Sequence, residues 1–115
     1  PSTGQLNAAI LYSAGNVTAY SDERVKTNWR GLTSDFVTKL AKVKSGIYDR
    51  TDTILTQVGV SAQSLKEILP EAIDEDQEGK LSVAYGHAAL AACVEMAKEI
   101  VALRKRLEKL EVHNV

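Results

Sequence analysis

The chain has few of the residues on which most metal sites and histidine-dependent enzymes rely. Its 115 residues include one cysteine and two histidines. The single cysteine, Cys93, cannot form a disulfide within the chain, and we expect it at a buried apolar position. The sequence also lacks a glycine-rich loop and a spaced set of metal ligands. We therefore expect no metal and no other cofactor.

An excess of positive charge is also missing. The chain has 14 basic and 15 acidic residues, and its formal net charge is -1. Tight binding to nucleic acid or to an anionic membrane requires a basic footprint, so we expect protein partners and neither of these two. No apolar run approaches the roughly 20 residues of a membrane-spanning helix, and these residues do not include the basic-then-apolar pattern of a signal sequence. The length of the chain, 115 residues, favours one domain with a modest core and a flanking piece.

Charge is absent from the first 20 residues, which contain no Lys, Arg, Asp or Glu. Apolar residues alternate with their neighbours over 6–12, turn-forming residues follow, and a second apolar stretch covers 17–20. This pattern predicts a strand, a turn and a strand. Residues 1–20 are either a hairpin of the same domain or the C-terminal end of an upstream β-rich fibre. Charges become frequent after Ser21, so we place a domain boundary there, with residues 21–115 as the second domain.

The stretch after this boundary predicts a helix and then a hairpin. Apolar residues recur at helical spacing over 34–44, which predicts a helix there. The polar cluster at 49–52 is suited to a turn between strands at 47–48 and 54–60.

A second short helix and a strand are expected next. Ser64 to Glu67 has the spacing of a capping box, and the helix that it begins should run to Pro70. The acidic residues 74–79 lack the ordered pattern of a calcium loop and are expected to form a solvated turn. Residues 81–85 then form a short strand. With the helix that follows, the predicted fold class is α+β.

Proline and glycine are absent from His87 to Val112, where Ala, Leu, Glu, Lys and Arg dominate. This composition predicts one long helix. Its apolar residues recur at spacings of four and three, which is the a/d seam of a coiled coil. A helix packed on its own domain is the alternative, but beyond Ile100 the other faces are almost wholly charged, which suits a narrow seam. The expected seam consists of Ala89, Cys93, Met96, Ile100, Leu103, Leu107 and Leu110.

Charged residues beside this seam indicate how the helices pair. With Ile100 at position a, Glu99 and Arg106 occupy g positions, while Arg104 and Glu111 occupy e positions. In a parallel bundle, a g residue meets the e residue five positions further along the neighbouring helix. Both meetings, Glu99 with Arg104 and Arg106 with Glu111, join opposite charges. The pattern favours parallel self-association and leaves the number of helices open.

Ser21 and Lys26 are the candidate catalytic residues. A serine hydroxyl is a weak nucleophile until a base removes its proton, and a desolvated lysine can be that base without any histidine. Spacing alone is weak support, since a serine and a lysine five residues apart usually lie on a solvated surface. The charge of Asp22 would raise the pKa of a neighbouring lysine and oppose its action as a base. We therefore expect Asp22 to point elsewhere or to bind backbone.

Several motifs occur in a fixed order along the chain. Residues 21–28 read Ser-Asp-Glu-Arg-Val-Lys-Thr-Asn, residues 58–63 read Val-Gly-Val-Ser-Ala-Gln, and Pro70-Glu71 and Tyr85 precede the long helix. Together they resemble the C-terminal intramolecular chaperone domain of phage tailspikes, tail fibres and endosialidases, a family of self-cleaving serine peptidases. The resemblance runs from residue 21 to about residue 110.

Two residues depart from the pattern of this family. Trp29 stands where an aliphatic residue is common, and Ser61 replaces the usual aliphatic residue of the Gly-Val-x-Ala-Gln motif. Both departures concern local packing and leave the candidate dyad unchanged.

The resemblance implies a chaperone that acts on its own chain. Three copies would form a homotrimer with a parallel trimeric coiled coil, and they would hold the upstream β-fibre in register while it winds. The domain would then cut the bond between Tyr20 and Ser21, with Ser21 as nucleophile and Lys26 as base. Such a protein is made in the host cytoplasm as a virion tail precursor, and its chaperone domain is released after cleavage.

Two other functions remain alternatives to this interpretation. One is a non-catalytic trimerisation module, and the other is the corresponding self-cleaving domain of a membrane-tethered transcription factor.

Overall fold

The computed structural model describes residues 4–113 and has an α+β fold. The chain divides into two compact units, Pro1–Arg30 and Gly31–Val115.

In the first unit, residues 4–20 form no strand. The expected strands at 6–12 and 17–20 are therefore wrong for the single chain. The apolar side chains of this segment are exposed, including Leu6, Tyr12 and Val17, and only a local turn forms, in which the Ser13 hydroxyl donates to the Gly15 carbonyl over 2.8 Å. An isolated two-stranded hairpin is marginal in water, and alternation alone does not supply the packing that a sheet needs.

A single turn of 3-10 helix, η1 (Glu23–Val25), is the ordered element of the first unit. Asp22 caps this turn, because its carboxylate accepts a hydrogen bond from the Arg24 amide at 2.9 Å. The same carboxylate forms an ion pair with the Arg24 guanidinium at 2.7 Å. The turn closes when the Lys26 amide donates to the Glu23 carbonyl over 2.9 Å.

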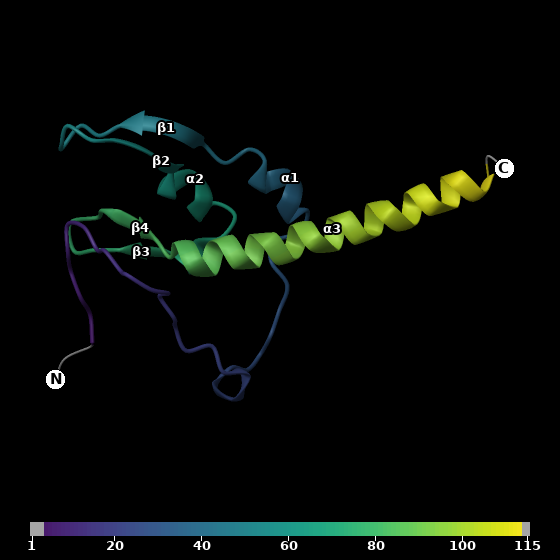
Figure 1. Ribbon diagram of the computed structural model, residues 1–115, viewed down its shortest axis with the longest axis horizontal. Coiled ribbons are helices and arrows are strands. Elements are labelled where there is room, and N and C mark those ends of the chain that lie inside the picture. Colours follow the sequence, from purple (N-terminus) through teal and green to yellow (C-terminus); the bar gives the residue numbers. More distant parts are fainter. Residues whose placement is uncertain (1–3, 114–115) are drawn as a thin grey trace. The chain divides into compact units, whose positions relative to one another are not determined.

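The second unit combines two small antiparallel hairpins, short helical segments and one long helix (Figure 1). In chain order its elements are α1 (Phe36–Leu40), β1 (Ser45–Asp49), β2 (Thr56–Val60), α2 (Ala62–Lys66), η2 (Pro70–Ala72), β3 (Ile73–Glu75), β4 (Leu81–Val83) and α3 (Tyr85–His113).

The hairpin of β1 and β2 confirms the expectation for residues 47–60. Ile47 pairs with Val58 in its register, and both side chains are exposed. The second hairpin, β3 with β4, corrects the expectation for the acidic segment, because Asp74 and Glu75 belong to β3 and pair with β4. The turn is restricted to the residues after Glu75. There the Asp76 carboxylate accepts hydrogen bonds from the backbone amides of residues 78 and 80 at 2.9 and 2.8 Å.

Both short helices differ from the expected boundaries. α1 begins only at Phe36 because Asp35 has φ 54, in the left-handed region, and cannot be part of a right-handed helix. α2 begins at Ala62 because Ser61, and not Ser64, is its N-cap: the Ser61 hydroxyl accepts from the Ser64 amide over 3.2 Å. The Ser64 hydroxyl instead accepts from the Lys44 amide over 3.1 Å.

The core lies where these short elements meet the first turns of α3. Five of the described residues are buried, and they form one cluster: Phe36, Leu65, Leu69, Ala72 and Ala88. The helix joins the core through Ala88 and the partly buried Ala92. Small side chains at these positions allow α1 and η2 to approach the helix backbone.

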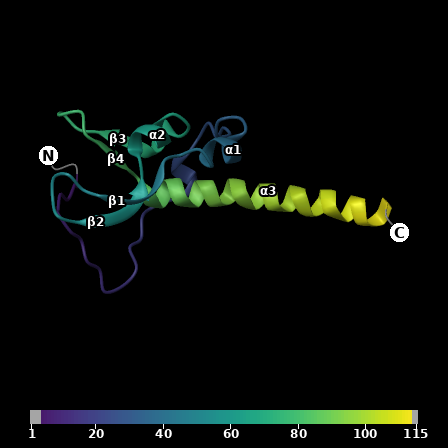
Figure 2. The same ribbon diagram turned by 90° about the horizontal axis from the view of Figure 1, so that it is seen from above.

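The long helix α3 confirms the expected helix within two residues at its start. Its C-terminal half extends past the other elements of the second unit in both views (Figures 1 and 2). Ile100, Leu103 and Leu107 are exposed there. Cys93 is also exposed, so its expected burial is wrong for the single chain. Among residues 4–113, no helix is long and apolar enough to cross a membrane.

The first prediction concerns the cap of α2. Ser61→Ala should lower the free energy of unfolding by about 1 kcal/mol, because the Ser64 amide loses its acceptor at the start of the helix. Ser61→Asp should retain the wild-type value, since aspartate is an equally good N-cap. Urea denaturation of the 115-residue chain measures both variants. Equal stability of Ser61→Ala and wild type would contradict the cap.

The second prediction concerns the turn at residues 22–26. The hydrogen bond from the Arg24 side chain lowers the pKa of the Asp22 carboxyl below its ordinary 3.8. A depressed carboxyl pKa stabilises the turn above the ordinary pKa, and this contribution disappears as the pH falls through the lowered value. An NMR titration should show the shift in wild type and its reduction in Arg24→Ala. Arg30→Ala should leave it unchanged, because Arg30 bonds to the Asn28 carbonyl.

Candidate active site

The side chains of Ser21 and Lys26 lie in direct contact. The Lys26 Nζ atom is 2.5 Å from the Ser21 hydroxyl oxygen. It is also 3.2 Å from the backbone carbonyl oxygen of Ser21. Among the residues that the structure describes, no other serine hydroxyl is hydrogen-bonded to a lysine side chain. The two residues therefore form a nucleophile and base pair in geometry, with the lysine as the donor in this arrangement.

The turn η1 is the reason that two residues five apart in the sequence meet. Lys26 follows the turn with extended backbone, at φ -123 and ψ 138. The chain reverses over three residues, and the lysine side chain then reaches back to Ser21. This contact depends on local geometry alone, because every residue that makes it lies within residues 21–26.

Asp22 is engaged by Arg24 and not by the lysine, as expected. Its carboxylate accepts from the Arg24 Nε atom over 3.1 Å and from the Arg24 amide over 2.9 Å. The arginine therefore occupies the carboxylate, whose hydrogen bonds among the described residues are all with Arg24. No role was predicted for Arg24 from the sequence, although its position two residues after the carboxylate is a signal for such a pair.

Trp29 is the second neighbour of the dyad that sequence reasoning missed. The Lys26 ammonium lies 5.9 Å from the centre of the Trp29 ring, within the range of a cation–π interaction. The spacing of three residues between a lysine and an aromatic residue was a readable signal. The departure from the family pattern at Trp29 was expected to affect local packing only. In the structure, Trp29 also lies beside Lys26, a member of the dyad.

The dyad is open to solvent in the single chain. Tyr20, Ser21 and Lys26 are all exposed. Only a neutral amine can act as the base, and desolvation is what favours the neutral form of a lysine. The geometry of a base is therefore present, while the removal of water that such a base needs is not provided by the single chain.

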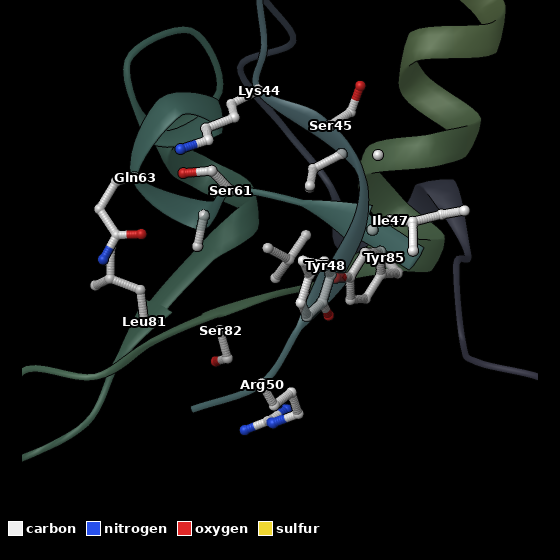
Figure 3. A pocket seen from close by; sticks show the side chains of 15 residues that line it. Lys44, Ser45, Ile47, Tyr48, Arg50, Ser61, Gln63, Leu81, Ser82 and Tyr85 are labelled. Atoms are coloured by element: carbon white, nitrogen blue, oxygen red, sulfur yellow. The ribbon is translucent and has the colours of Figure 1, made fainter. Parts of the chain in front are cut away.

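A cavity of about 580 Å³ lies in the second unit, between the β1–β2 hairpin, the start of α2 and β4. Its wall includes Lys44, Arg50, Gln63 and Tyr85 (Figure 3). Gly59 packs closely here, because a Cβ atom at this position would lie 3.3 Å from the Tyr85 hydroxyl, a tight contact, and 3.5 Å from the Tyr48 ring, an ordinary one. The cavity wall contains three serines, but within the described residues none of their hydroxyls is hydrogen-bonded to a lysine side chain.

The expected seam residues lie on α3 and are exposed in the single chain, from Ala89 to Leu110. The charged residues beside them are exposed too, namely Glu99, Arg104, Arg106 and Glu111. Within the described part of α3, the ion pair between side chains is Lys98 with Glu95 at 3.2 Å. Seam and flanking charges are therefore free to contact other chains. No group of three or more His, Cys, Asp or Glu residues in the described part of the chain could hold a metal ion.

Comparison with known proteins adds to this geometry. Residues 21–74 match the family described as chaperone of endosialidase, Peptidase_S74. The chain is 33% identical over 113 residues to the long tail fiber protein Gp37 of Enterobacteria phage K3 and to that of Enterobacteria phage T2. Each alignment covers 91% of this chain, which spans only 9% and 8% of those relatives. The candidate dyad lies at the start of the family match, and residues 21–74 of this chain are similar to the chaperone of endosialidase family.

Proposed function

We propose that the chain is a C-terminal intramolecular chaperone of a phage tail fibre that trimerises and then cuts itself between Tyr20 and Ser21. The observation that carries the proposal is the 2.5 Å contact between the Lys26 amine and the Ser21 hydroxyl, at the first residues of the family match. The tail fibre relatives support the assignment of the upstream partner as a β-fibre of the same chain and of the complex as a virion tail component.

The proposed chemistry is an acyl shift followed by hydrolysis. A neutral Lys26 amine takes the proton of the Ser21 hydroxyl, and the oxygen attacks the carbonyl carbon of Tyr20. The Tyr20–Ser21 carbon–nitrogen bond breaks, and the Ser21 nitrogen takes the proton from Lys26. The resulting ester joins Tyr20 to the Ser21 side chain. Water then hydrolyses the ester and leaves one fragment that ends at Tyr20 and one that begins at Ser21.

Assembly of three chains would supply the step that the single chain lacks. Lys26 is exposed in the single chain, and a lysine acts as a base at neutral pH only when it is desolvated. We therefore propose that contacts in the trimer exclude water from the dyad. Cleavage would then follow assembly, and the release of the chaperone would be irreversible.

The chaperone role follows from the cost of bringing distant segments together. Strands from separate chains must meet in register before their contacts stabilise them, which makes such pairing slow. A helical trimer forms from contacts along one element and raises the effective concentration of the attached chains. In the proposed trimer, the seam from Ala89 to Leu110 on three parallel copies of α3 performs this task.

The third prediction tests the dyad. The 115-residue chain should yield fragments 1–20 and 21–115 by intact mass spectrometry, and Ser21→Ala should abolish both. Lys26→Arg should also abolish cleavage, because a guanidinium keeps its proton. The matched controls Ser13→Ala and Lys42→Arg should cleave like wild type.

Cleavage of Ser21→Ala would remove the dyad from the proposal, and full activity of Lys26→Arg would mean that a different base operates. A wild-type chain that is trimeric and stays whole would instead favour a non-catalytic trimerisation module.

The fourth prediction tests the parallel register of the seam. Glu99→Arg places like charges opposite Arg104 of the neighbouring chain and should weaken trimerisation in a salt-sensitive manner. Each exposed pair is worth only about 0.2–1 kcal/mol, but a trimer repeats the change at three interfaces. The double variant Glu99→Arg/Arg104→Glu restores opposite charges and should recover most of the loss. Sedimentation equilibrium at low and high salt measures both, and an unrecovered double variant would contradict the register.

A further inference from the structure

The first half of α3 carries a second row of apolar side chains beside the seam. These residues are spaced four, three and four apart, and none of them is covered by the described residues of the chain. Val94 is 48% exposed and Val101 46%, close to the 51% of the seam residue Ile100. The row consists of Leu90, Val94, Ala97 and Val101, which we call the flank row.

The flank row lies on a different side of the helix from both the seam and the core. At about 100° per residue, the row is about 100° from seam residues 89–100 in one direction. The core-facing residues Ala88 and Ala92 are about 90° from these seam residues in the other direction. The helix is therefore apolar on three sides at residues 88–92 and on two sides from there to residue 101, because Glu95 and Glu99 occupy the core-facing c and g positions. A helix that is apolar all round is normally buried.

The flank row lies mostly along the first half of α3, where the globular part of the second unit, residues 31–84, also lies. After Val101 the same side of the helix presents Arg104 and Glu108, which are exposed. Figures 1 and 2 both show α1 beside the first half of α3. Neither figure shows an element of the second unit beside the second half of α3. Along this side, α3 thus changes from apolar to charged in its second half, which extends past the globular part. The globular part of the same chain, however, packs on the opposite side of the helix.

Heptad positions identify which surface comes next to the flank row. Ala92 occupies a g position and Ala88 a c position, so the globular part of each chain packs on the g and c side of its own helix. Leu90 and Ala97 occupy e positions, while Val94 and Val101 occupy b positions. In a parallel coiled coil, the g side of one helix faces the e side of the next. A globular part packed on the g side therefore points toward the flank row of the neighbouring helix.

We propose that the globular part of each chain docks on the flank row of the neighbouring copy, so that it is held between two helices of the trimer. The occupant is a second copy of this chain, and the surface that it presents is the outer side of α1. Each contact joins two different surfaces, and three such contacts close a ring. The inference rests on the proposed parallel trimer and adds an interface that the seam does not require.

The experiment that tests the docking begins with sedimentation equilibrium of the 115-residue chain. Leu90→Lys/Val94→Lys should raise the concentration at which half of the chains are trimeric by at least about tenfold, because two apolar side chains per copy lose their cover. Circular dichroism should show an unchanged helix, since both positions are exposed in the single chain and lysine is a good helix former. The matched control is Glu108→Lys, at a b position beyond the globular part, and it should assemble like wild type.

Cross-linking between chains identifies the occupant. In a Cys93→Ser background, chains with Val94→Cys are mixed with chains carrying Thr38→Cys, an exposed position of α1. A short bismaleimide should join the two kinds of chain. Chains with Glu108→Cys, at the same heptad position two heptads further along, should not be joined to them.

The outcomes separate this inference from the proposed function. A trimeric wild type together with an equally stable Leu90→Lys/Val94→Lys trimer, or with no cross-link from Val94→Cys, overturns the docking and leaves the seam intact. A monomeric wild-type chain overturns the proposed trimer itself and the docking with it.

Discussion

The feature on which the rest of this structure depends is the long helix α3, whose apolar surface is left largely uncovered by its own chain. α3 contains 29 residues, whereas the buried cluster beside it contains five of the described residues. Among the described residues of α3, only Ala88 and the partly buried Ala92 join that cluster. Burial of apolar surface is the main favourable term in both folding and association. In the single copy, much of the apolar surface of α3 stays exposed and does not contribute this term. Self-association is the change that would bury this surface.

In the candidate site, the contact between Ser21 and Lys26 and the desolvation that would activate the lysine have separate structural origins. A turn of three residues brings Lys26 to Ser21, and the Asp22 carboxylate forms its ion pair with Arg24. Those features need no other part of the chain. Desolvation of the lysine, by contrast, requires surrounding atoms that the single chain does not place there. In the proposed mechanism this division delays cleavage until the chains have assembled.

Packing accounts for several residues of the family motifs outside the dyad. Gly59 leaves room for the Tyr48 and Tyr85 side chains, and the Ser61 amide donates to the Lys44 carbonyl over 2.8 Å. The hydroxyl of Ser61 also caps α2, which explains why serine is suitable where an aliphatic residue is usual in the family. The motif at 58–63 thus fixes the junction of β2 with α2 and forms part of the cavity wall.

Local pattern determined the long helix, the β1–β2 hairpin and the reach of Lys26 to Ser21, because each depends on residues close in the sequence. Tertiary structure decided the rest. Alternation in residues 6–20 predicted strands that do not form, since a strand needs partners and packing that no local pattern supplies. Ser64 has the spacing of a cap, but its hydroxyl binds the Lys44 amide, 20 residues away in the sequence, and Ser61 caps the helix instead. Burial of Cys93 was expected from its residue type, yet its exposure follows from its side of α3, because the core contacts the helix about a third of a turn away.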